Sequence, residues 1–255
     1  MPCNMPVYDQ DGISLYNDDC RNVLPIFPAE TFDMVITDPP YLVSYSGRWG
    51  SDWGMIEGDS DPSWVEPVFA EIARVLKQDS LCLTFYGWPH TDLFFSAWRK
   101  VGLRPVSSIV FLKNRIGLGH YTRSQHELAF LLAKGSPRKP DHAKSDVLHW
   151  QEAKPKLHPN QKPLGAIGRI IGTYTEEDAV ILDPFAGSGT TLLAARRLGR
   201  YAVGVEIDEN HCETAFFRLA QNMLPYSPPL TPEQLSLLDM IEPLLEEQPI
   251  QFGLG

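Results

Sequence analysis

The stretch FDMVITDPPY, residues 32–41, joins an apolar run to an acid, two prolines and a tyrosine. The apolar run lacks a polar face, which is typical of a strand buried on both sides in a parallel sheet. The two prolines end the strand, because neither can donate a hydrogen bond to a neighbouring strand. Asp38 and Tyr41 are therefore expected at the carboxyl edge of the sheet, where open α/β folds bind ligands. Taken alone, the stretch is also compatible with a stiff turn that binds nothing.

Six further apolar runs surround this stretch in the sequence and are expected to be strands. They cover residues 13–17, 80–86, 106–112, 128–133, 179–182 and 201–205. Segments with apolar residues at helical spacing or with helix-boundary signals lie at residues 63–77, 91–101, 163–174, 190–198 and 210–222. Because strands and helices alternate, the chain is expected to form a mostly parallel sheet with helices on both faces.

The length and composition of the chain exclude several classes of protein. Its 255 residues suffice for one large α/β domain or two small ones. No apolar run approaches the roughly 18 residues that span a membrane, and the first residues lack the order of a signal peptide. The four cysteines lie far apart and show no metal-ligand spacing with the histidines. We therefore expect a cytoplasmic protein without a disulfide framework, a membrane anchor or a bound metal.

The charge of the chain is unevenly distributed. A formal net charge of -10 argues against a nucleic-acid partner. Between Arg104 and Arg169, however, ten lysines and arginines stand against four acids. Such a segment can form a phosphate-binding surface on an acidic protein. A solvated lysine-rich loop is the alternative interpretation.

Two further segments begin without the hydrophobic periodicity of a strand or a helix. Residues 42–61 carry Arg48 and two tryptophans, which suit either a flap over a site or a loop anchored to the core. Residues 225–255 begin with a Pro-rich linker. Residues 233–247 then have the spacing of an acidic amphipathic helix, which is expected to dock on the domain or to serve an interface. Composition thus separates a domain over residues 1–224 from a tail over residues 225–255.

A second stretch, VILDPFAGSGTT at residues 180–191, predicts a strand, a glycine turn and the start of a helix. Such a turn lets a ligand approach the backbone, and Glu206, about 20 residues further on, could hold the hydroxyls of a ribose. A dinucleotide site requires a third glycine where Leu192 stands, and a phosphate-binding P-loop requires a lysine after Gly189. Asp183 would repel a pyrophosphate but suits an ammonium group. S-adenosyl-methionine combines a ribose with such an amine.

The two motifs together resemble those of amino-methylating DNA methyltransferases. Asp38-Pro39-Pro40-Tyr41 precedes the glycine motif, an order similar to that of the permuted β group of this family. HPNQKPL at residues 158–164 resembles the third cofactor motif of the family, and ELAFLLAKG at residues 127–135 resembles a family strand. Asp18-Asp19-Cys20 resembles the Gly-Asp-Cys that opens these chains, with Asp18 in place of glycine. The resemblance covers roughly residues 13–222.

This resemblance implies a Rossmann-like S-adenosyl-methionine-dependent methyltransferase fold with a mostly parallel, seven-stranded sheet. It implies a methyltransferase domain over residues 1–224, with a small target-recognition insertion around residues 114–157. The expected catalytic residues are Asp38, Pro39, Pro40 and Tyr41. The expected cofactor-binding residues are Asp19, Lys162, Asp183, Pro184, Phe185, Ala186, Gly187, Ser188, Gly189, Thr190, Thr191 and Glu206. Candidates for DNA contacts, which could equally be surface or structural residues, are Arg48, Arg115, Tyr121, Arg123, Lys139 and Lys144.

The implied reaction is methylation of the N6 amine of a flipped-out adenine in double-stranded DNA. Asp38 and the carbonyl of Pro39 would accept the hydrogens of the amine, and Tyr41 would stack on the base. Asp38, where cytosine-N4 enzymes more often carry serine, favours adenine. Cytosine N4, a non-catalytic cofactor-binding DNA subunit, and an amine methyltransferase for RNA or protein stay as alternatives. The sequence leaves open a homodimer and a restriction endonuclease encoded elsewhere.

Overall fold

The computed structural model describes residues 5–42, 61–117, 121–142, 144–150 and 162–221. By its contacts the chain divides into a first unit, Met1–Leu219, and a second unit, Ala220–Gly255. Of the second unit only the last two residues of a helix are described, so the fold below is that of the first unit. The expected flap with Arg48 and the expected tail helix lie outside the described residues.

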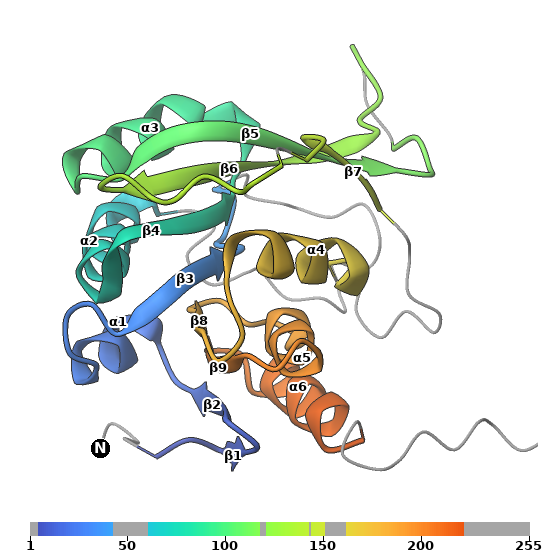
Figure 1. Cartoon of the computed structure of the whole chain (residues 1–255). Coiled ribbons are helices and arrows are strands. Elements are labelled where there is room, and N and C mark those ends of the chain that lie inside the picture. Colours follow the sequence, from blue (N-terminus) through green and yellow to red (C-terminus); the bar gives the residue numbers. More distant parts are fainter. Residues whose placement is uncertain (1–4, 43–60, 118–120, 143, 151–161, 222–255) are drawn as a thin grey trace, which may run out of the picture. The chain divides into compact units, whose positions relative to one another are not determined.

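The described residues form one sheet of nine strands (Figure 1). The strand order across the sheet is β1-β2-β9-β8-β3-β4-β6-β5-β7. The strands are β1 (Tyr8–Gln10), β2 (Ile13–Asn17), β3 (Phe32–Thr37), β4 (Leu76–Phe85), β5 (Arg104–Lys113), β6 (His126–Lys134), β7 (Val147–Trp150), β8 (Val180–Asp183) and β9 (Tyr201–Glu206).

The prediction of seven strands is wrong by two, since all seven expected strands are present and β1 and β7 are added at the two edges. The short β1 exposes two of its three residues, so it has no apolar pattern in the sequence. The other edge strand, β7, lies within the insertion expected around residues 114–157, and its residues alternate between exposed and buried.

The prediction of a mostly parallel sheet is confirmed for its centre. Strands β2, β9, β8, β3 and β4 are parallel to one another. In contrast, β6 is antiparallel to both β4 and β5, and β1 is antiparallel to β2. Because β6 pairs along its length with two strands and β7 pairs with β5, two parts of the segment at residues 114–157 belong to the sheet itself.

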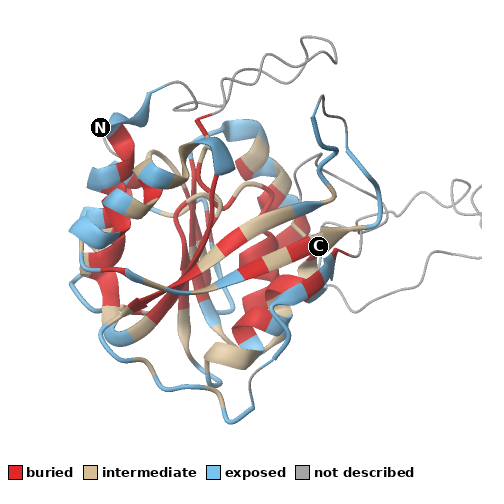
Figure 2. Ribbon diagram, turned by 90° about the horizontal axis from the view of Figure 1, so that it is seen from above, coloured by how far each residue is buried: buried red, intermediate tan, exposed pale blue. Residues whose placement is uncertain are grey.

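Helices cover both faces of the sheet (Figures 1 and 2). Helices α1 (Cys20–Val23), α2 (Val65–Val75) and α3 (Thr91–Lys100) share one apolar cluster with one face. Helices α4 (Leu164–Tyr174), α5 (Thr190–Arg197) and α6 (Glu209–Gln221) share the other cluster with the opposite face. Short 3₁₀ turns, η1 (Leu24–Ile26), η2 (Pro62–Trp64) and η3 (Trp88–His90), complete the list.

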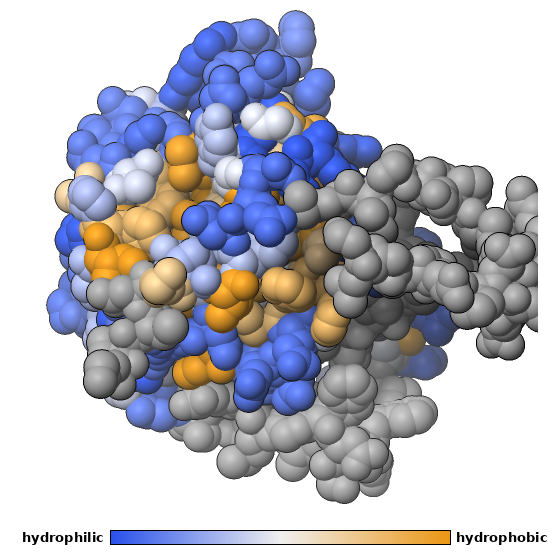
Figure 3. All heavy atoms as spheres, turned by 90° about the horizontal axis from the view of Figure 1, so that it is seen from below, coloured by the Kyte–Doolittle hydropathy of each residue, from blue (hydrophilic) through white to orange (hydrophobic). Residues whose placement is uncertain are grey.

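Strand β3 shows why its sequence has no polar face. Met34 and Ile36 belong to the cluster under α4–α6, whereas Val35 belongs to the cluster under α1–α3. Successive side chains of a strand point to opposite faces, so a strand covered on both sides needs apolar residues throughout. Outside this core, hydrophobic residues on the face drawn in Figure 3 are interspersed with hydrophilic ones. In the described part of the chain, no helix is both long and apolar enough to cross a bilayer.

The pairing of β3 with β8 places the two sequence motifs at one edge of the sheet. Met34 lies opposite Ile181 and Val35 opposite Leu182 in a parallel register. The carboxyl ends of both strands therefore meet, with Asp38 following one and Asp183 ending the other. After β3 the chain goes to α2 on one face, and after β8 it goes to α5 on the other. Ligands of open α/β sheets bind at such a change of side.

Candidate active site

The loop after β3 holds an acid and an aromatic ring together. The Tyr41 hydroxyl donates a hydrogen bond to Asp38 Oδ1 at 2.8 Å. Gly87, after the end of the neighbouring β4, packs against the same loop. A Cβ atom at Gly87 would lie 2.3 Å from the carbonyl oxygen of Tyr41, so the close approach requires glycine. Two strand ends thus fix the position of the Asp38 carboxylate and the Tyr41 ring.

Lys162, two residues before α4, is a neighbour of Asp38. Its Nζ lies 2.6 Å from Asp38 Oδ2 and 2.9 Å from Glu127 Oε2, and it also donates to the Tyr41 hydroxyl oxygen at 3.3 Å. On the other side of Glu127, Lys113 Nζ lies 2.6 Å from Oε1. Asp38, Lys162, Glu127 and Lys113 therefore form a chain of alternating charges, which we call the charge chain.

Aromatic rings surround the Lys162 ammonium. Its Nζ lies 4.4 Å from the ring centroid of Phe85 in β4, 5.7 Å from that of Tyr41 and 5.8 Å from that of Trp150 in β7. Lys113 Nζ lies 5.0 Å from the Trp150 centroid. Distances below about 6 Å allow cation–π attraction, which adds to the ion pairs where water is excluded. The side chain of Lys162 is only 11% exposed.

Burial and the neighbouring charges shift the pKa values of Asp38, Lys162 and Glu127 in the charge chain. Burial alone would lower the pKa of Lys162, but Asp38, Tyr41 and Glu127 raise this pKa well above its usual value. Burial raises the pKa of Asp38, and Lys162 only partly opposes that rise. For Glu127, the two lysines outweigh burial and lower the pKa. Burial keeps the Tyr41 hydroxyl protonated by raising its pKa well above the usual range, so this group remains a donor.

The glycine turn after β8 forms the second half of the site. Asp183 is 5% exposed and accepts a hydrogen bond from the Phe185 backbone N–H at 3.1 Å. Gly187 and Gly189 have φ angles of 51° and 75°, in the left-handed region that other residues seldom adopt. Gly189 then caps α5, so the turn directs the first N–H groups of this helix toward the edge of the sheet.

Glu206, the last residue of β9, stabilises the glycine turn. Its Oε2 accepts a hydrogen bond from the Gly187 N–H at 2.7 Å, and its Oε1 accepts one from the Asp208 N–H at 2.9 Å. Burial raises the pKa of Glu206 and raises that of Asp183 to about 7. Buried carboxyl groups beside an open backbone turn fit a ligand that carries both hydroxyl groups and a positive charge.

Arg218 in α6 was not recognised from the sequence. It is 6% exposed, and its Nη1 donates to the Ser188 carbonyl oxygen, to Ser188 Oγ at 2.9 Å and to Thr190 Oγ1 at 3.2 Å. It therefore ties the glycine turn to α6. Its place next to Leu219 on the buried side of an amphipathic helix was the available signal, because an arginine there needs several acceptors.

Asp19 lies at the same edge of the sheet but is engaged within its own turn. It caps α1 by accepting from the Arg21 N–H at 2.8 Å, and it also binds the Arg21 guanidinium. The preceding Asp18 N–H donates to the Glu206 carbonyl oxygen at 3.1 Å, which holds this turn beside the end of β9. The expected role of Asp19 toward an adenine stays a prediction.

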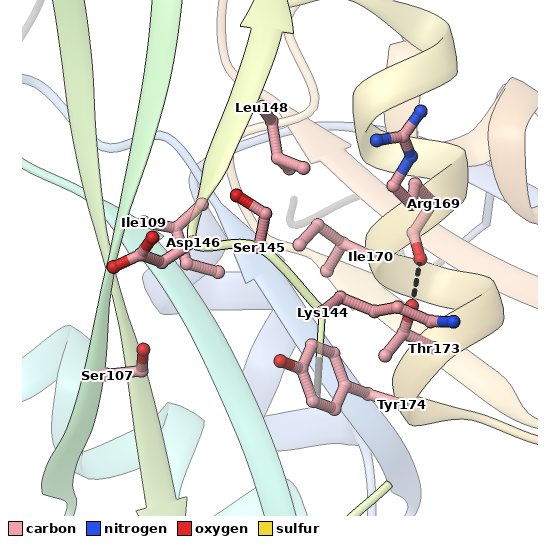
Figure 4. A pocket seen from close by; sticks show the side chains of 10 residues that line it. All are labelled: Ser107, Ile109, Lys144, Ser145, Asp146, Leu148, Arg169, Ile170, Thr173 and Tyr174. Carbon is pink, nitrogen blue, oxygen red and sulfur yellow. Dashed lines mark hydrogen bonds between the residues drawn. The ribbon is translucent and has the colours of Figure 1, made fainter. Parts of the chain in front are cut away.

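The DNA-contact candidates fall into two groups. Arg115, Tyr121 and Arg123 are exposed on the connection between β5 and β6, at the same edge as Asp38. Lys139 and Lys144 follow the end of β6 at the opposite edge. Lys144 lines a cavity of about 40 Å³ between β5, the start of β7 and α4 (Figure 4). The structure thus brings three of the candidates toward the two motifs but not these two lysines.

Comparisons with known proteins point to one family. The profile of a family described as "DNA methylase" matches residues 32–217. The putative methylase YubD of Escherichia coli (strain K12) is 40% identical over 202 residues, which cover 79% of this chain and 88% of YubD. The type II methyltransferase M2.LlaDCHI of Lactococcus lactis subsp. cremoris is 26% identical over 248 residues, covering 84% and 91% of the two chains.

Solved structures show the same fold at lower sequence identity. The M1.HpyAVI-SAM complex has a TM-score of 0.65 and 24% identity, and the match covers 81% of this chain and 98% of that one. The PvuII DNA methyltransferase, described as cytosine-N4-specific, has a TM-score of 0.72 and 18% identity, covering 97% and 98% of the two chains.

Proposed function

Because this chain belongs to the DNA methylase family, we propose that it methylates the N6 amine of adenine at a specific sequence in double-stranded DNA. One observation carries the proposal. Asp38 follows β3 and Asp183 ends β8, and these two strands are parallel neighbours. An acceptor for an amine and a site for a cationic ligand therefore meet at one edge of the sheet. The order of these motifs along the chain is that of the permuted β group.

S-adenosyl-methionine is the methyl donor, and it supplies an electrophilic methyl group on a positively charged sulfur. Two solved neighbours, M1.HpyAVI and TTHA0409, are described as complexes with this compound. In this chain Asp183, Glu206 and the backbone of the glycine turn would hold it. The buried carboxyl groups suit its positive charges, and Glu206 retains lone pairs for hydroxyl groups.

The residues of the first motif prepare the base. The lone pair of an exocyclic amine is delocalised into the ring, so acceptors for its two hydrogens make the nitrogen a better nucleophile. Asp38 and the Pro39 carbonyl oxygen supply these acceptors. The Tyr41 ring, fixed by its hydrogen bond to Asp38, stacks on the base, a contact worth about 1–3 kcal/mol. Asp38 receives the proton that the methylated amine releases. A stacked base cannot reach this geometry, so the adenine is flipped out of the duplex.

The choice between adenine and cytosine is tested by the products. We incubate undermethylated bacterial genomic DNA with the purified full chain and S-adenosyl-methionine, digest it to nucleosides and analyse them by mass spectrometry. N6-methyladenine is expected. N4-methylcytosine without methyladenine would overturn the choice of base, and the PvuII enzyme illustrates that outcome on a similar fold. Absence of both products, while the protein still binds cofactor and DNA, would favour a non-catalytic subunit.

The recognition part of the proposal concerns Arg115, Tyr121 and Arg123. Their exposed side chains on the β5–β6 connection suit contacts with phosphates or bases beside the flipped nucleotide. A homodimer and a separate restriction endonuclease remain predictions, and the name of M2.LlaDCHI as a type II methyltransferase motivates a search for the latter.

A further inference from the structure

The charge chain contains a feature that methyl transfer by Asp38 and Tyr41 does not explain. Lys162 lies almost buried between two carboxylates that come from different parts of the sheet. Asp38 follows β3 and Glu127 lies in β6, and Lys113 of β5 contacts the second oxygen of the Glu127 carboxylate. A buried charge is retained only where partners compensate its loss of hydration. Each member of the charge chain has such a partner.

We propose that Lys162, held in place by Glu127, is a positioning residue that fixes the orientation of the Asp38 carboxylate toward the target amine. The proposal rests on the proposed function, since it assigns a role within the same site. Lys162 occupies one direction of Oδ2, and the Tyr41 hydroxyl occupies one direction of Oδ1. With one neighbour on each oxygen, the carboxylate cannot rotate without breaking a bond. The remaining lone pairs are then available in a fixed direction for an N–H donor.

Glu127 determines where the ammonium group lies. The lysine side chain has four rotatable bonds. Without Glu127, Asp38 would be the one carboxylate among the described residues that holds the Lys162 ammonium group. Glu127 Oε2 and Asp38 Oδ2 contact Nζ at 2.9 Å and 2.6 Å, while the Phe85 ring lies 4.4 Å away. Lys113 holds the other oxygen of Glu127 at 2.6 Å. The position of the catalytic carboxylate is thereby connected to the β5–β6 pair, whose connecting loop carries Arg115 and Arg123.

The geometry gives Lys162 and Glu127 opposite electrostatic effects on Asp38. Among the residues that the structure describes, the charged or titratable groups that act on Asp38 are Lys162 before α4, Glu127 in β6, Tyr41 in its own loop and Asp183 in β8. Lys162 lowers the pKa of Asp38 and Glu127 raises it. Ionised Asp38 accepts from the amine more strongly than neutral Asp38 does, and only the ionised form can receive the proton of the amine. Loss of the lysine charge therefore moves the loss of activity in acid to higher pH, and loss of the glutamate charge moves it to lower pH.

A direct titration tests the proposal without relying on activity. The full chain is labelled with ¹³C at aspartate carboxyl carbons, and Asp38→Asn identifies the Asp38 signal. In Lys162→Met we expect the pKa of Asp38 to rise by about one to three units, the usual effect of losing an opposite charge at this distance. In Glu127→Gln we expect it to fall. Lys162→Arg retains the charge and should shift the Asp38 signal least. Lys100→Met, which removes an exposed lysine paired with Glu66, is the matched control and should leave it unchanged.

Activity and cofactor binding complete the experiment. The pH profile of kcat/KM for methyl transfer to genomic DNA should move in the same opposite directions, while calorimetry shows unchanged affinity for S-adenosyl-methionine in Lys162→Met. Shifts in one direction for both variants, or none, would overturn the proposal. A loss of cofactor affinity with an unmoved Asp38 signal would instead support the role in cofactor binding expected from the sequence. If the Asp38 pKa shifts in opposite directions in the two variants but the wild-type protein methylates no DNA, the positioning role is retained and the proposed function is rejected. If Lys162→Met does not fold, Glu127→Gln still decides by its sign.

Discussion

The carboxylates of the two motifs are stabilised in different ways. Asp38, after β3, is paired with the ammonium group of Lys162. Asp183, at the end of the adjacent β8, is instead held by the Phe185 N–H and the Thr191 hydroxyl, and no described lysine or arginine contacts it. One half of the site therefore carries its own counter-charge, whereas the other half has an acid whose charge a ligand would balance. The first arrangement suits a neutral base and the second a cationic cofactor.

Removing the acid of the first half should have the largest effect on the reaction. We expect Asp38→Ala to lower kcat by about 100- to 1,000-fold, the usual effect of deleting a preorganised partner of the reacting group. Cofactor affinity should stay near that of the wild type because Asp183 and Glu206 are untouched. Methyl transfer is followed with radiolabelled S-adenosyl-methionine and binding by calorimetry. A variant that methylates DNA at the wild-type rate would contradict the catalytic role of Asp38.

Arg218 tests whether the second half depends on a fixed backbone turn. We expect Arg218→Met to lower the free energy of unfolding by about 1.5–3 kcal/mol, the range for hydrogen bonds to a charged group, and to weaken cofactor binding. Thermal unfolding and calorimetry measure the two effects. Arg197→Met, on the exposed side of α5, is the control. Equal behaviour of the two variants would mean that Arg218 does not hold the turn.

Asp183 gives the second half a dependence on pH. Since burial raises its pKa to about 7, the carboxyl group is mostly neutral at pH 6 and mostly charged at pH 8. Affinity for the cationic cofactor should rise by about tenfold over this interval, as the ionised fraction does. The free protein should lose stability over the same rise in pH, because folding disfavours the charged form. Calorimetry at several pH values should show both trends in the wild type and smaller ones in Asp183→Asn, because burial also raises the pKa values of Glu206 and Asp38.

Tyr41→Phe should have the smallest effect, and it separates the ring from its hydroxyl. The variant keeps stacking and loses the hydrogen bond to Asp38, a bond worth about 0.5–1.5 kcal/mol. We therefore expect kcat to fall by less than about tenfold, and we expect a larger loss for Tyr41→Ala, in which stacking is also lost. If both variants lose activity equally, the hydroxyl rather than the ring is the important group.

The two halves also differ in how far the sequence predicts them. The glycine motif is local, so the strand, the turn and the helix start could be located from residues 180–191. Tyr41 is a local partner of Asp38, but the charge chain is not local. Lys162 contacts Asp38, and Glu127 and Lys113 follow Lys162 in this chain of charges. They meet because β6 runs antiparallel between β4 and β5, and the apolar pattern of β6 does not specify its direction. A motif therefore indicated that Lys162 is functional, but not that it contacts Asp38.

The same limit explains the errors at the edges of the sheet. The seven strands with apolar patterns were found, because burial on both faces imposes such a pattern on most of them. The edge strands β1 and β7 depend on pairing with a neighbour and expose residues such as Asp9 and His149. Arg218 was overlooked for a related reason, since its acceptors on the glycine turn are about 30 residues away in the chain.

The pairing of β2 with β9 has a consequence for biosynthesis. Ile13 near the start of the chain lies opposite Ala202, and β9 separates β2 from β8. While the ribosome is still translating the middle of the chain, β2 has no parallel partner, and β3 lacks its neighbour β8. Contacts between such distant residues slow folding and leave apolar strands exposed in the nascent chain. The sheet edge that carries both motifs therefore assembles only when most of the polypeptide has emerged, and a chain that ends before β8 lacks the glycine turn and Glu206.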